Sequence, residues 1–291
     1  MPALPVGCDA ARRMDPARLP PGLYIVATPI GNLGDLSPRA ADILCRADLV
    51  LAEDKRVSAK LLSHAGAKTR MATYHDHTSE EERDRILARL GEETVALVSD
   101  AGTPLISDPG YKLVRAARAA GHSVHTVPGP SAVIAALTLA GLPTDRFLFA
   151  GFLPAKAKAR DDAIAELAGV RATLAFYESG PRLADTLAAL RKSLGDREAA
   201  VVREISKLHE ETATGSLSEL AARYANKPPK GEIVVVVGPP ADRPEASDDD
   251  LDAALDVALQ RLSPSRAAAE VAALLDLPRK RAYARALERS K

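Results

Sequence analysis

Glycine, proline and charged residues are concentrated in five loops, each next to a short apolar run of the chain. Glycine lets a backbone approach a ligand closely, and open α/β sheets bind ligands beyond the ends of their strands. Each loop alone could be an ordinary turn or an ion-paired surface. Together they indicate a binding site assembled from several strand ends. The five loops span 29–35 (PIGNLGD), 99–110 (SDAGTPLISDPG), 127–132 (VPGPSA), 176–182 (FYESGPR) and 203–211 (REISKLHEE).

The loop residues favour some ligands over others. The chain contains neither G-x-G-x-x-G nor G-x-x-x-x-G-K-[ST], so the common dinucleotide and triphosphate motifs are absent. Asp100 could accept hydrogen bonds from a ribose or an ammonium group, and Ser131 lies at a predicted helix start. His75 and His77 have a spacing that could bind a metal, but the sequence offers no evident third ligand. We therefore expect no metal.

Two series of short apolar runs, separated by helical patterns, must position these loops. Such runs predict strands that are buried on both faces. The alternation predicts an α/β fold with two α/β domains, one at 22–128 and one at 129–240. The apolar runs lie at 23–27, 49–52, 95–98 and 124–127, and then at 147–150, 173–177, 199–202 and 233–237.

The two ends of the chain differ from this pattern. Residues 1–21 are rich in Pro, Ala and Arg without any periodicity, which predicts a flexible N-terminal extension. Residues 238–250 (GPPADRPEASDDD) have the composition of a linker. Beyond it, Pro278 separates two short helical patterns, so we predict a helical, helix-turn-helix-like unit over 248–291.

The overall composition limits the partners of the chain. Lys plus Arg and Asp plus Glu each number 39, so any contact with nucleic acid must come from a local basic patch. Aromatic residues make up 3% of the chain, which argues against a platform that stacks several single-stranded bases. Two basic patches could bind phosphate, one at Lys156 and Lys158 and one from Arg279 to Arg289. Either patch could instead serve solubility alone.

Apolar stretches and cysteines indicate the compartment. The longest apolar stretch, residues 132–142, is too short to span a membrane. Arg12 and Arg13 are not followed by the apolar core of a secretory signal. The two cysteines are too few for a disulfide framework or a Cys-based zinc site. We expect a soluble, cytoplasmic protein.

In their order along the chain, the loops resemble those of the tetrapyrrole methylase fold superfamily, and within it the branch that methylates ribosomal RNA. The resemblance covers residues 22–238 and rests on stretches such as LYIVATPIGNLGDLSPRA, VALVSDAGTPLISDPGYKLV, VPGPSAVIAAL, FYESGPRL and REISKLHEE. It implies S-adenosylmethionine as cofactor, in a cleft between the two α/β domains, and a homodimer. It also implies methylation of the ribose 2′-hydroxyl of a cytidine in the decoding region of 16S rRNA. The cofactor contacts that it implies are Pro29, Gly31, Asp100, Gly102, Thr103, Pro104, Ser131, Ala132 and Tyr177.

A ribose hydroxyl is a poor nucleophile at neutral pH, so a base or a charge stabiliser should assist its methylation. We predict that Asp54, Arg56, Glu178 and Arg203 line the acceptor side as catalytic residues. Lys55 stands where the family commonly has threonine, which changes the rim of the site. The residues that we expect to bind RNA are Lys55, His75, Lys156, Lys158, Arg182, Lys207, Arg279, Lys280, Arg281 and Arg285.

Two other functions stay open at this point. The same fold could methylate a small tetrapyrrole or a protein side chain, although the basic C-terminal segment argues against this. The chain could also be a noncatalytic RNA-binding assembly factor, although its intact ligand loops argue against that. If RNA is the substrate, we expect the assembled small ribosomal subunit, because a folded particle displays a shape that a short RNA lacks.

Overall fold

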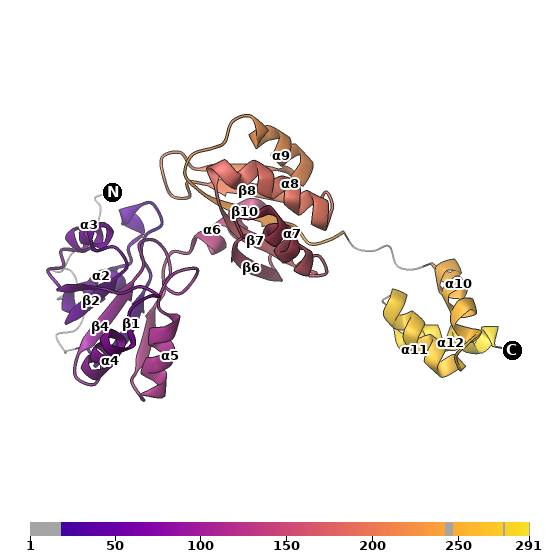
Figure 1. Cartoon of the computed structure of the whole chain (residues 1–291), viewed down its shortest axis with the longest axis horizontal. Helices are drawn as coiled ribbons and strands as arrows, with labels where there is room; N and C mark the ends of the chain where they lie inside the picture. The colour runs from indigo at the N-terminus through magenta and orange to yellow at the C-terminus, as the bar shows by residue number, and fades with distance from the viewer. Residues whose placement is uncertain (1–18, 242–246, 276, 291) are drawn as a thin grey trace. The chain divides into compact units, whose positions relative to one another are not determined.

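The computed structural model describes residues 19–241, 247–275 and 277–290, in one compact unit up to Pro240 and a second unit from Ala241. Residues 1–18 of the predicted extension and 242–246 of the predicted linker lie outside the described residues. The first unit contains two five-stranded sheets with helices packed against them (Figure 1), which confirms the α/β class. The boundary between two domains within this unit stays a prediction.

The first sheet is parallel throughout, with its strands in the order β3-β2-β4-β1-β5. Alternate residues of a strand face opposite sides. Leu23 and Ile25 therefore pack with α4 and α5, whereas Tyr24 and Val26 pack with α2 and α3. Because both faces are covered, the strands are apolar along their length. The elements are β1 (Gly22–Val26), η1 (Leu33–Asp35), α2 (Pro38–Arg46), β2 (Leu49–Ala52), α3 (Lys55–Ala65), β3 (Met71–Thr73), α4 (Glu80–Arg89), β4 (Thr94–Val98), α5 (Tyr111–Ala119) and β5 (Val124–Val127).

The strand order places three of the predicted loops next to one another at the carboxyl ends of the strands of this sheet. β1 pairs with both β4 and β5, so the loops that follow these three strands leave the sheet side by side. The backbones of Thr28 and Gly102 exchange two hydrogen bonds, of 2.8 and 3.1 Å, and so join the first loop to the second. The Thr103 hydroxyl donates to the Pro130 carbonyl at 3.0 Å and joins the second loop to the third.

The second sheet is mixed, with its strands in the order β6-β7-β10-β8-β9. β6 and β7 are parallel, whereas the other neighbours are antiparallel. Helix α6 packs on one face of the sheet, and α7, α8 and α9 pack on the other. The elements are α6 (Ala132–Ala140), β6 (Phe147–Phe152), α7 (Ala157–Glu166), β7 (Thr173–Ser179), η2 (Gly180–Arg182), α8 (Leu183–Leu194), β8 (Glu198–Arg203), β9 (Glu211–Ser216), α9 (Leu217–Ala225) and β10 (Glu232–Val237).

Serine residues fix where several of these helices begin. Ser37 accepts a hydrogen bond from the Ala40 amide at 3.1 Å, and Pro38 occupies the first position of α2. Ser216 and Glu219 form a complete capping box at the start of α9. These side chains satisfy amides that the first helical turn leaves without a carbonyl partner. The helix starts therefore follow from local sequence.

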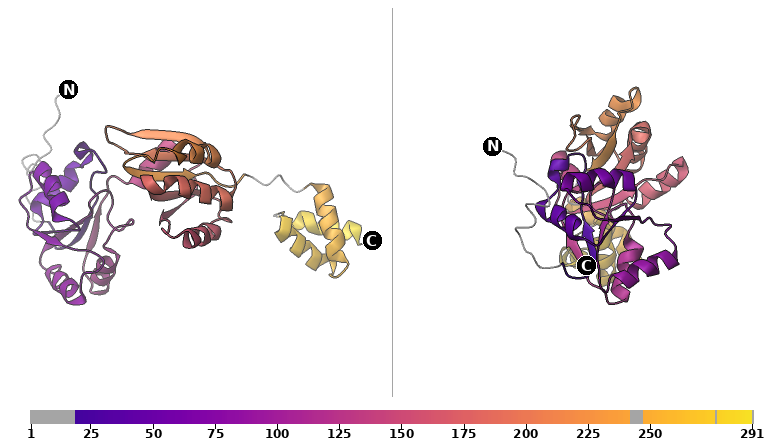
Figure 2. Two further views of the ribbon diagram at one scale, coloured as in Figure 1. Left: turned by 45° about the horizontal axis from the view of Figure 1, so that its top comes forward. Right: turned by 90° about the vertical axis from the view of Figure 1, so that its left-hand side faces the viewer.

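The second unit is a bundle of three helices: α10 (Asp248–Leu259), α11 (Pro264–Leu275) and α12 (Arg279–Arg289) (Figure 2). It has its own apolar core, in which Leu251 and Leu255 of α10 pack against Val271 of α11 and Ala282 of α12. The sequence predicts only two helices here, and the acidic segment ahead of them forms the third, because Ser247 caps it with Asp250. No helix in the described part of the chain is long and apolar enough to cross a membrane.

Candidate active site

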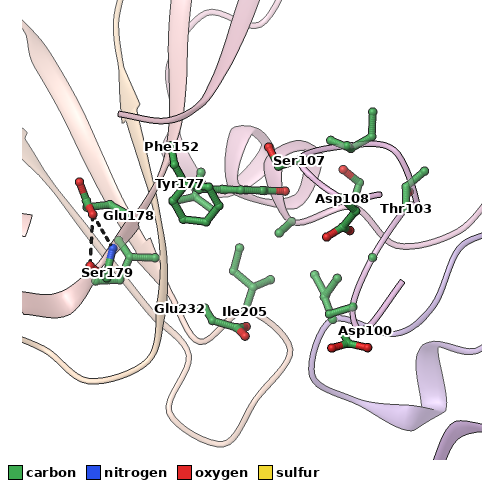
Figure 3. A pocket seen from close by; sticks show the side chains of 18 of the residues that line it. Asp100, Thr103, Ser107, Asp108, Phe152, Tyr177, Glu178, Ser179, Ile205 and Glu232 are labelled. Atoms are coloured by element: carbon green, nitrogen blue, oxygen red, sulfur yellow. Dashed lines mark hydrogen bonds between the residues drawn. The ribbon is translucent and has the colours of Figure 1, made fainter. Parts of the chain in front are cut away.

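Loops from both sheets of the first unit enclose a cavity of about 430 Å³ (Figure 3). The first sheet contributes the ends of β2 and β4, the loop 99–110 and the turn after β1. The second sheet contributes the ends of β6 and β7 and the start of β10. The residues that line the cavity are Ile30, Glu53, Asp100, Ala101, Gly102, Thr103, Ile106, Ser107, Asp108, Ser131, Ala132, Phe152, Tyr177, Glu178, Ser179, Ile205, Gly231, Glu232, Ile233 and Val234.

Three carboxyl groups give the first-sheet side of the cavity an acidic character. They belong to Glu53, Asp100 and Asp108. Burial raises the pKa of Asp108 to about 6, the negative charges of Glu53 and Asp100 add to the rise, and a hydrogen bond from Ser99 opposes it. Burial also raises the pKa of Glu53, with further contributions from Asp100 and Asp76. Asp108 can therefore exchange a proton near neutral pH.

Aromatic rings form part of the opposite side. Tyr177 reaches from β7 toward Asp108 (Figure 3), and its ring lies edge-on to Phe149 at 4.7 Å and to Phe152 at 5.4 Å between centroids. Burial raises the pKa of the Tyr177 phenol, and the charge of Asp108 adds to this rise. Phe152 is 59% exposed. The cavity thus combines an acidic side with an aromatic one.

Two of the loops that border the cavity, 99–110 and 203–211, contain backbone conformations that residues other than glycine rarely adopt. Leu105 and Ser107 have φ of 74° and 61°, and Glu204 and Ser206 have φ of 52° and 63°. Such left-handed conformations cost free energy and are often found at functional sites. In the part of the chain that the structure describes, these four are the non-glycine residues with positive φ.

Six of the nine residues expected to contact the cofactor line this cavity: Asp100, Gly102, Thr103, Ser131, Ala132 and Tyr177. Pro29 and Pro104 are buried and do not line it. Gly31 does not line it either, because its turn packs against the loop 203–211. A Cβ atom at Gly31 would lie 2.5 Å from Cγ of Lys207 and 2.8 Å from the carbonyl oxygen of Ile205. The glycine lets the two loops come this close.

Glu178 is among the residues that line the cavity, but its carboxylate points away from it. The carboxylate is 1% exposed and accepts hydrogen bonds from the Ser179 amide at 2.8 Å and the Thr186 hydroxyl at 2.6 Å. Figure 3 shows it turned away from the Tyr177 ring. Neighbouring residues of a strand face opposite sides, and Tyr177 occupies the cavity side of β7. Glu178 therefore secures β7 to α8.

Unlike Glu178, the other three predicted catalytic residues do not line the cavity. Asp54 caps α3 and pairs with Arg56 at 2.8 Å, and these hydrogen bonds lower the pKa of Asp54 to about 2. A carboxyl group of such low pKa is a weak base. The Asp54 amide does donate to the Asp100 carboxylate at 3.2 Å, so this residue orients a cavity side chain. Arg203 pairs with Glu211 at 2.6 Å.

Several of the predicted RNA contacts are held by other groups of the chain. Lys207 pairs with Glu204 and Glu232, both at 3.0 Å. Arg182 donates to the Leu153 carbonyl at 2.6 Å. Lys156 and Lys158, the first of the two predicted basic patches, lie at the start of α7. The remaining candidates divide as follows: Lys158, Arg281 and Arg285 pair with Asp162, Asp248 and Asp252, whereas Lys55, His75, Lys156, Arg279 and Lys280 are exposed.

Among the lining side chains that the sequence did not single out are Glu53, Asp108 and Phe152. Asp108 could have been found, since it lies in the same small-residue loop as Asp100. Glu53 directly follows a predicted apolar run, which is also a detectable signal. Among the described residues, no group of three His, Cys, Asp or Glu side chains could hold a metal ion.

Comparison with known proteins gives one consistent family. A family model described as tetrapyrrole (corrin/porphyrin) methylases matches residues 22–221, and one described as the RsmI C-terminal HTH domain matches residues 245–290. Two proteins named ribosomal RNA small subunit methyltransferase I are similar to the chain. The one from Erythrobacter litoralis is 56% identical over 93% of this chain and 96% of its own length. The one from Mesorhizobium japonicum is 49% identical over 94% of each chain.

A solved structure has the same fold as the first unit. It is uroporphyrin-III C-methyl transferase from Thermus thermophilus, complexed with S-adenyl homocysteine. It superposes with a TM-score of 0.51 and 23% identity, over 75% of this chain and 97% of that chain. This likeness supports the fold assignment alone.

Proposed function

The chain belongs to the tetrapyrrole methylase family, and we propose that it transfers the methyl group of S-adenosylmethionine to the ribose 2′-hydroxyl of a cytidine in the decoding region of 16S rRNA. The name of its relatives supports ribosomal RNA of the small subunit as the substrate, since they match over more than nine-tenths of the chain. The cytidine and the decoding region come from the resemblance of the loops. The observation that carries the proposal is the acidic, aromatic cavity between the two sheets.

The cavity suits S-adenosylmethionine in size and charge. Its volume of about 430 Å³ lies within the usual range for small-molecule sites. The cofactor carries a sulfonium and an ammonium group, and the carboxyl groups of Glu53, Asp100 and Asp108 offer opposite charge. We infer that Asp100, Gly102, Thr103, Ser131, Ala132 and Tyr177 hold it. When bound, S-adenosylmethionine supplies an electrophilic methyl group.

The chain must then align the acceptor and remove the hydroxyl proton. We assign proton removal to Asp108, in place of the predicted catalytic carboxylates Asp54 and Glu178. Asp108 lies in the cavity, and its pKa of about 6 leaves it ionised at neutral pH yet still able to bind a proton. Asp54 is too weak a base, and the Glu178 carboxylate is turned away.

We also propose that the protein acts in the cytoplasm as a homodimer. Exposed apolar side chains support self-association. Ile134 and Leu139 lie on α6, and Phe147 lies on the edge strand β6, which belongs to the same sheet that α6 covers. Exposed apolar groups of this kind often mark interfaces. Light scattering of the purified protein would test this: a monomer mass at micromolar concentration would contradict it.

The main experiment supplies labelled S-adenosylmethionine and small ribosomal subunits that lack the modification. We expect label on the ribose of a cytidine in the decoding region, and the same assay on free 16S rRNA shows whether the assembled subunit is required. Cofactor binding without label in RNA would contradict the RNA substrate and point to a small tetrapyrrole or a protein side chain. Absence of cofactor binding would contradict the enzymatic function itself.

A further inference from the structure

Helices α10 and α12 of the second unit are joined by a ladder of three ion pairs. Asp248 pairs with Arg281 at 2.8 Å, and Asp252 pairs with Arg285 at 2.6 Å. The third rung joins Asp256 to Arg289 at 2.7 Å. The partners in every rung are 33 residues apart, and the rungs repeat every four residues along each helix.

This ladder determines which side of α12 is available to a partner. Residues four apart lie on the same face of a helix. The face of α12 with the most arginines is therefore committed to α10, and its charges are balanced by aspartates. Arg281 and Arg285, which were predicted to bind RNA, lie on this committed face. The candidates that remain in α12 are Arg279 and Lys280.

A different part of α12 forms a small hollow with the start of α11. Ser265, Arg279, Lys280 and Tyr283 line it, and it measures about 290 Å³. We call these four residues the cationic hollow. No acidic residue lines it, and neither Arg279 nor Lys280 makes an ion pair within residues 247–275 and 277–290. Among the described residues, the Arg279 guanidinium donates a hydrogen bond to the Ser265 hydroxyl, at 3.5 Å.

We propose that the cationic hollow binds a backbone phosphate of ribosomal RNA, and this inference rests on the proposed function. The Arg279 guanidinium and the Lys280 ammonium have no acidic partner among the described residues of the second unit. Together with the two neighbouring hydroxyl groups, they match the charge and the acceptor oxygens of a phosphodiester. Ser265 and Arg279 also lie in the first turns of α11 and α12, where backbone amides favour an anion.

Tyr283 makes RNA a better fit than an acidic peptide. It lies one helical turn after Lys280 and is 41% exposed, so its ring borders the hollow and remains open to solvent. An exposed ring beside a phosphate-binding cation can stack on a nucleotide base. The ladder holds α12 in the rotation that presents Lys280 and Tyr283 together. In this arrangement the aspartates of α10 orient the hollow and do not contact the RNA.

The test uses the full-length protein and measures its affinity for a 16S rRNA transcript across a range of KCl concentrations. Each phosphate contact contributes about 0.7 to 0.9 to the slope of log affinity against log salt concentration. We expect Arg279→Gln with Lys280→Gln to lower the slope by about 0.7 to 0.9, the contribution of one phosphate contact, and to weaken binding several-fold at low salt. Tyr283→Ala should weaken binding while leaving the slope unchanged.

Two control variants make the result specific. Lys227→Gln removes an exposed lysine of the first unit and should leave the slope unchanged. Arg266→Gln removes an exposed arginine of α11 that does not line the hollow, and it should also keep the slope. Circular dichroism of every variant establishes that the second unit is folded.

The outcomes separate this inference from the proposed function. If the double variant had an unchanged slope and methylated RNA like the wild type, phosphate binding by the cationic hollow would be refuted. The proposed methyltransferase function would be unaffected. Tight binding to small subunits together with no binding to naked rRNA would indicate a ribosomal protein as the contact and would also refute phosphate binding by the hollow. A wild-type protein that neither binds nor methylates RNA would overturn both.

Discussion

Asp108 and Tyr177 face one another across the cavity, although Asp108 lies in a loop that follows a strand of the first sheet and Tyr177 lies in a strand of the second. Burial and the charge of Asp108 together raise the pKa of the Tyr177 phenol, so the ring stays neutral and the carboxylate is the group that titrates near neutral pH. The site therefore depends on both sheets for its acid–base behaviour.

The first prediction concerns the pH dependence of methyl transfer. The pKa of Asp108 is raised to about 6, so its basic form disappears as the pH falls below this value. We expect kcat/KM to rise with pH through about 6 and then to level off. Asp108→Asn should lower kcat/KM by roughly 10²–10⁴-fold and remove this dependence. Asp108→Glu should restore part of the lost activity. If kcat/KM of the asparagine variant still rose with pH through about 6, the role of Asp108 as the base would be refuted.

The second prediction separates the structural role of Glu178 from a catalytic one. In Glu178→Gln the amide cannot accept from both Ser179 and Thr186, so one buried polar group loses its partner. We expect the free energy of unfolding, measured in urea, to fall by about 1–3 kcal/mol. The dependence of kcat/KM on pH should be preserved. If a folded Glu178→Gln variant lost the rise of kcat/KM near pH 6, Glu178 would instead be the base.

The third prediction concerns the close packing at Gly31. Gly31→Ala places a Cβ against Lys207 and the Ile205 backbone, and Ile205 lines the cavity. We expect the dissociation constant for S-adenosylmethionine, measured by calorimetry, to rise by about tenfold, since a misplaced loop disturbs ligand alignment. Gly34→Ala is the matched control, because a Cβ there would meet only the Asn32 side chain. Equal affinities in the two variants would contradict this explanation.

The fourth prediction concerns the ladder in the second unit. The ion pairs with Arg285 and Arg289 lower the pKa of Asp252, so the charged, paired form is present at neutral pH. The stability that it contributes should be lost as the pH falls through this lowered value. Asp252→Asn should lower the melting temperature of the second unit in dilute buffer, and the difference should shrink in 1 M salt. A difference that persists in salt would indicate a role other than the ion pair.

Much of the scaffold could be predicted from the sequence, because burial on both faces leaves apolar runs that are easy to recognise. The run 23–27 is an example: β1 occupies most of it, between β4 and β5. The loops 99–110 and 127–132 could also be predicted as site loops, since each follows such a strand. It was harder to predict from the sequence which way an individual side chain points. Tyr177 and Glu178 are neighbours on one strand, so they could not both face the cavity.

The charged residues were the least predictable part. Arg285 lies in a basic segment, and only the packing of α10 against α12 places Asp252 within reach of it. Lys207 is similar, since its partner Glu232 is brought close by the pairing of β10 with β8. Composition shows how many charges a chain carries, whereas tertiary structure determines which of them are balanced.

The left-handed residues Leu105, Ser107, Glu204 and Ser206 lie in the loops 99–110 and 203–211, which both contribute residues to the cavity lining. Free peptides of these sequences would rarely adopt such conformations. The sheets therefore impose the shape of the loops during folding, before any ligand arrives. Binding then requires little further loss of chain entropy, which is the physical meaning of preorganisation. Loops without these left-handed residues would cost less free energy to fold. They would also be less ordered before binding, so the small molecule would bind more weakly.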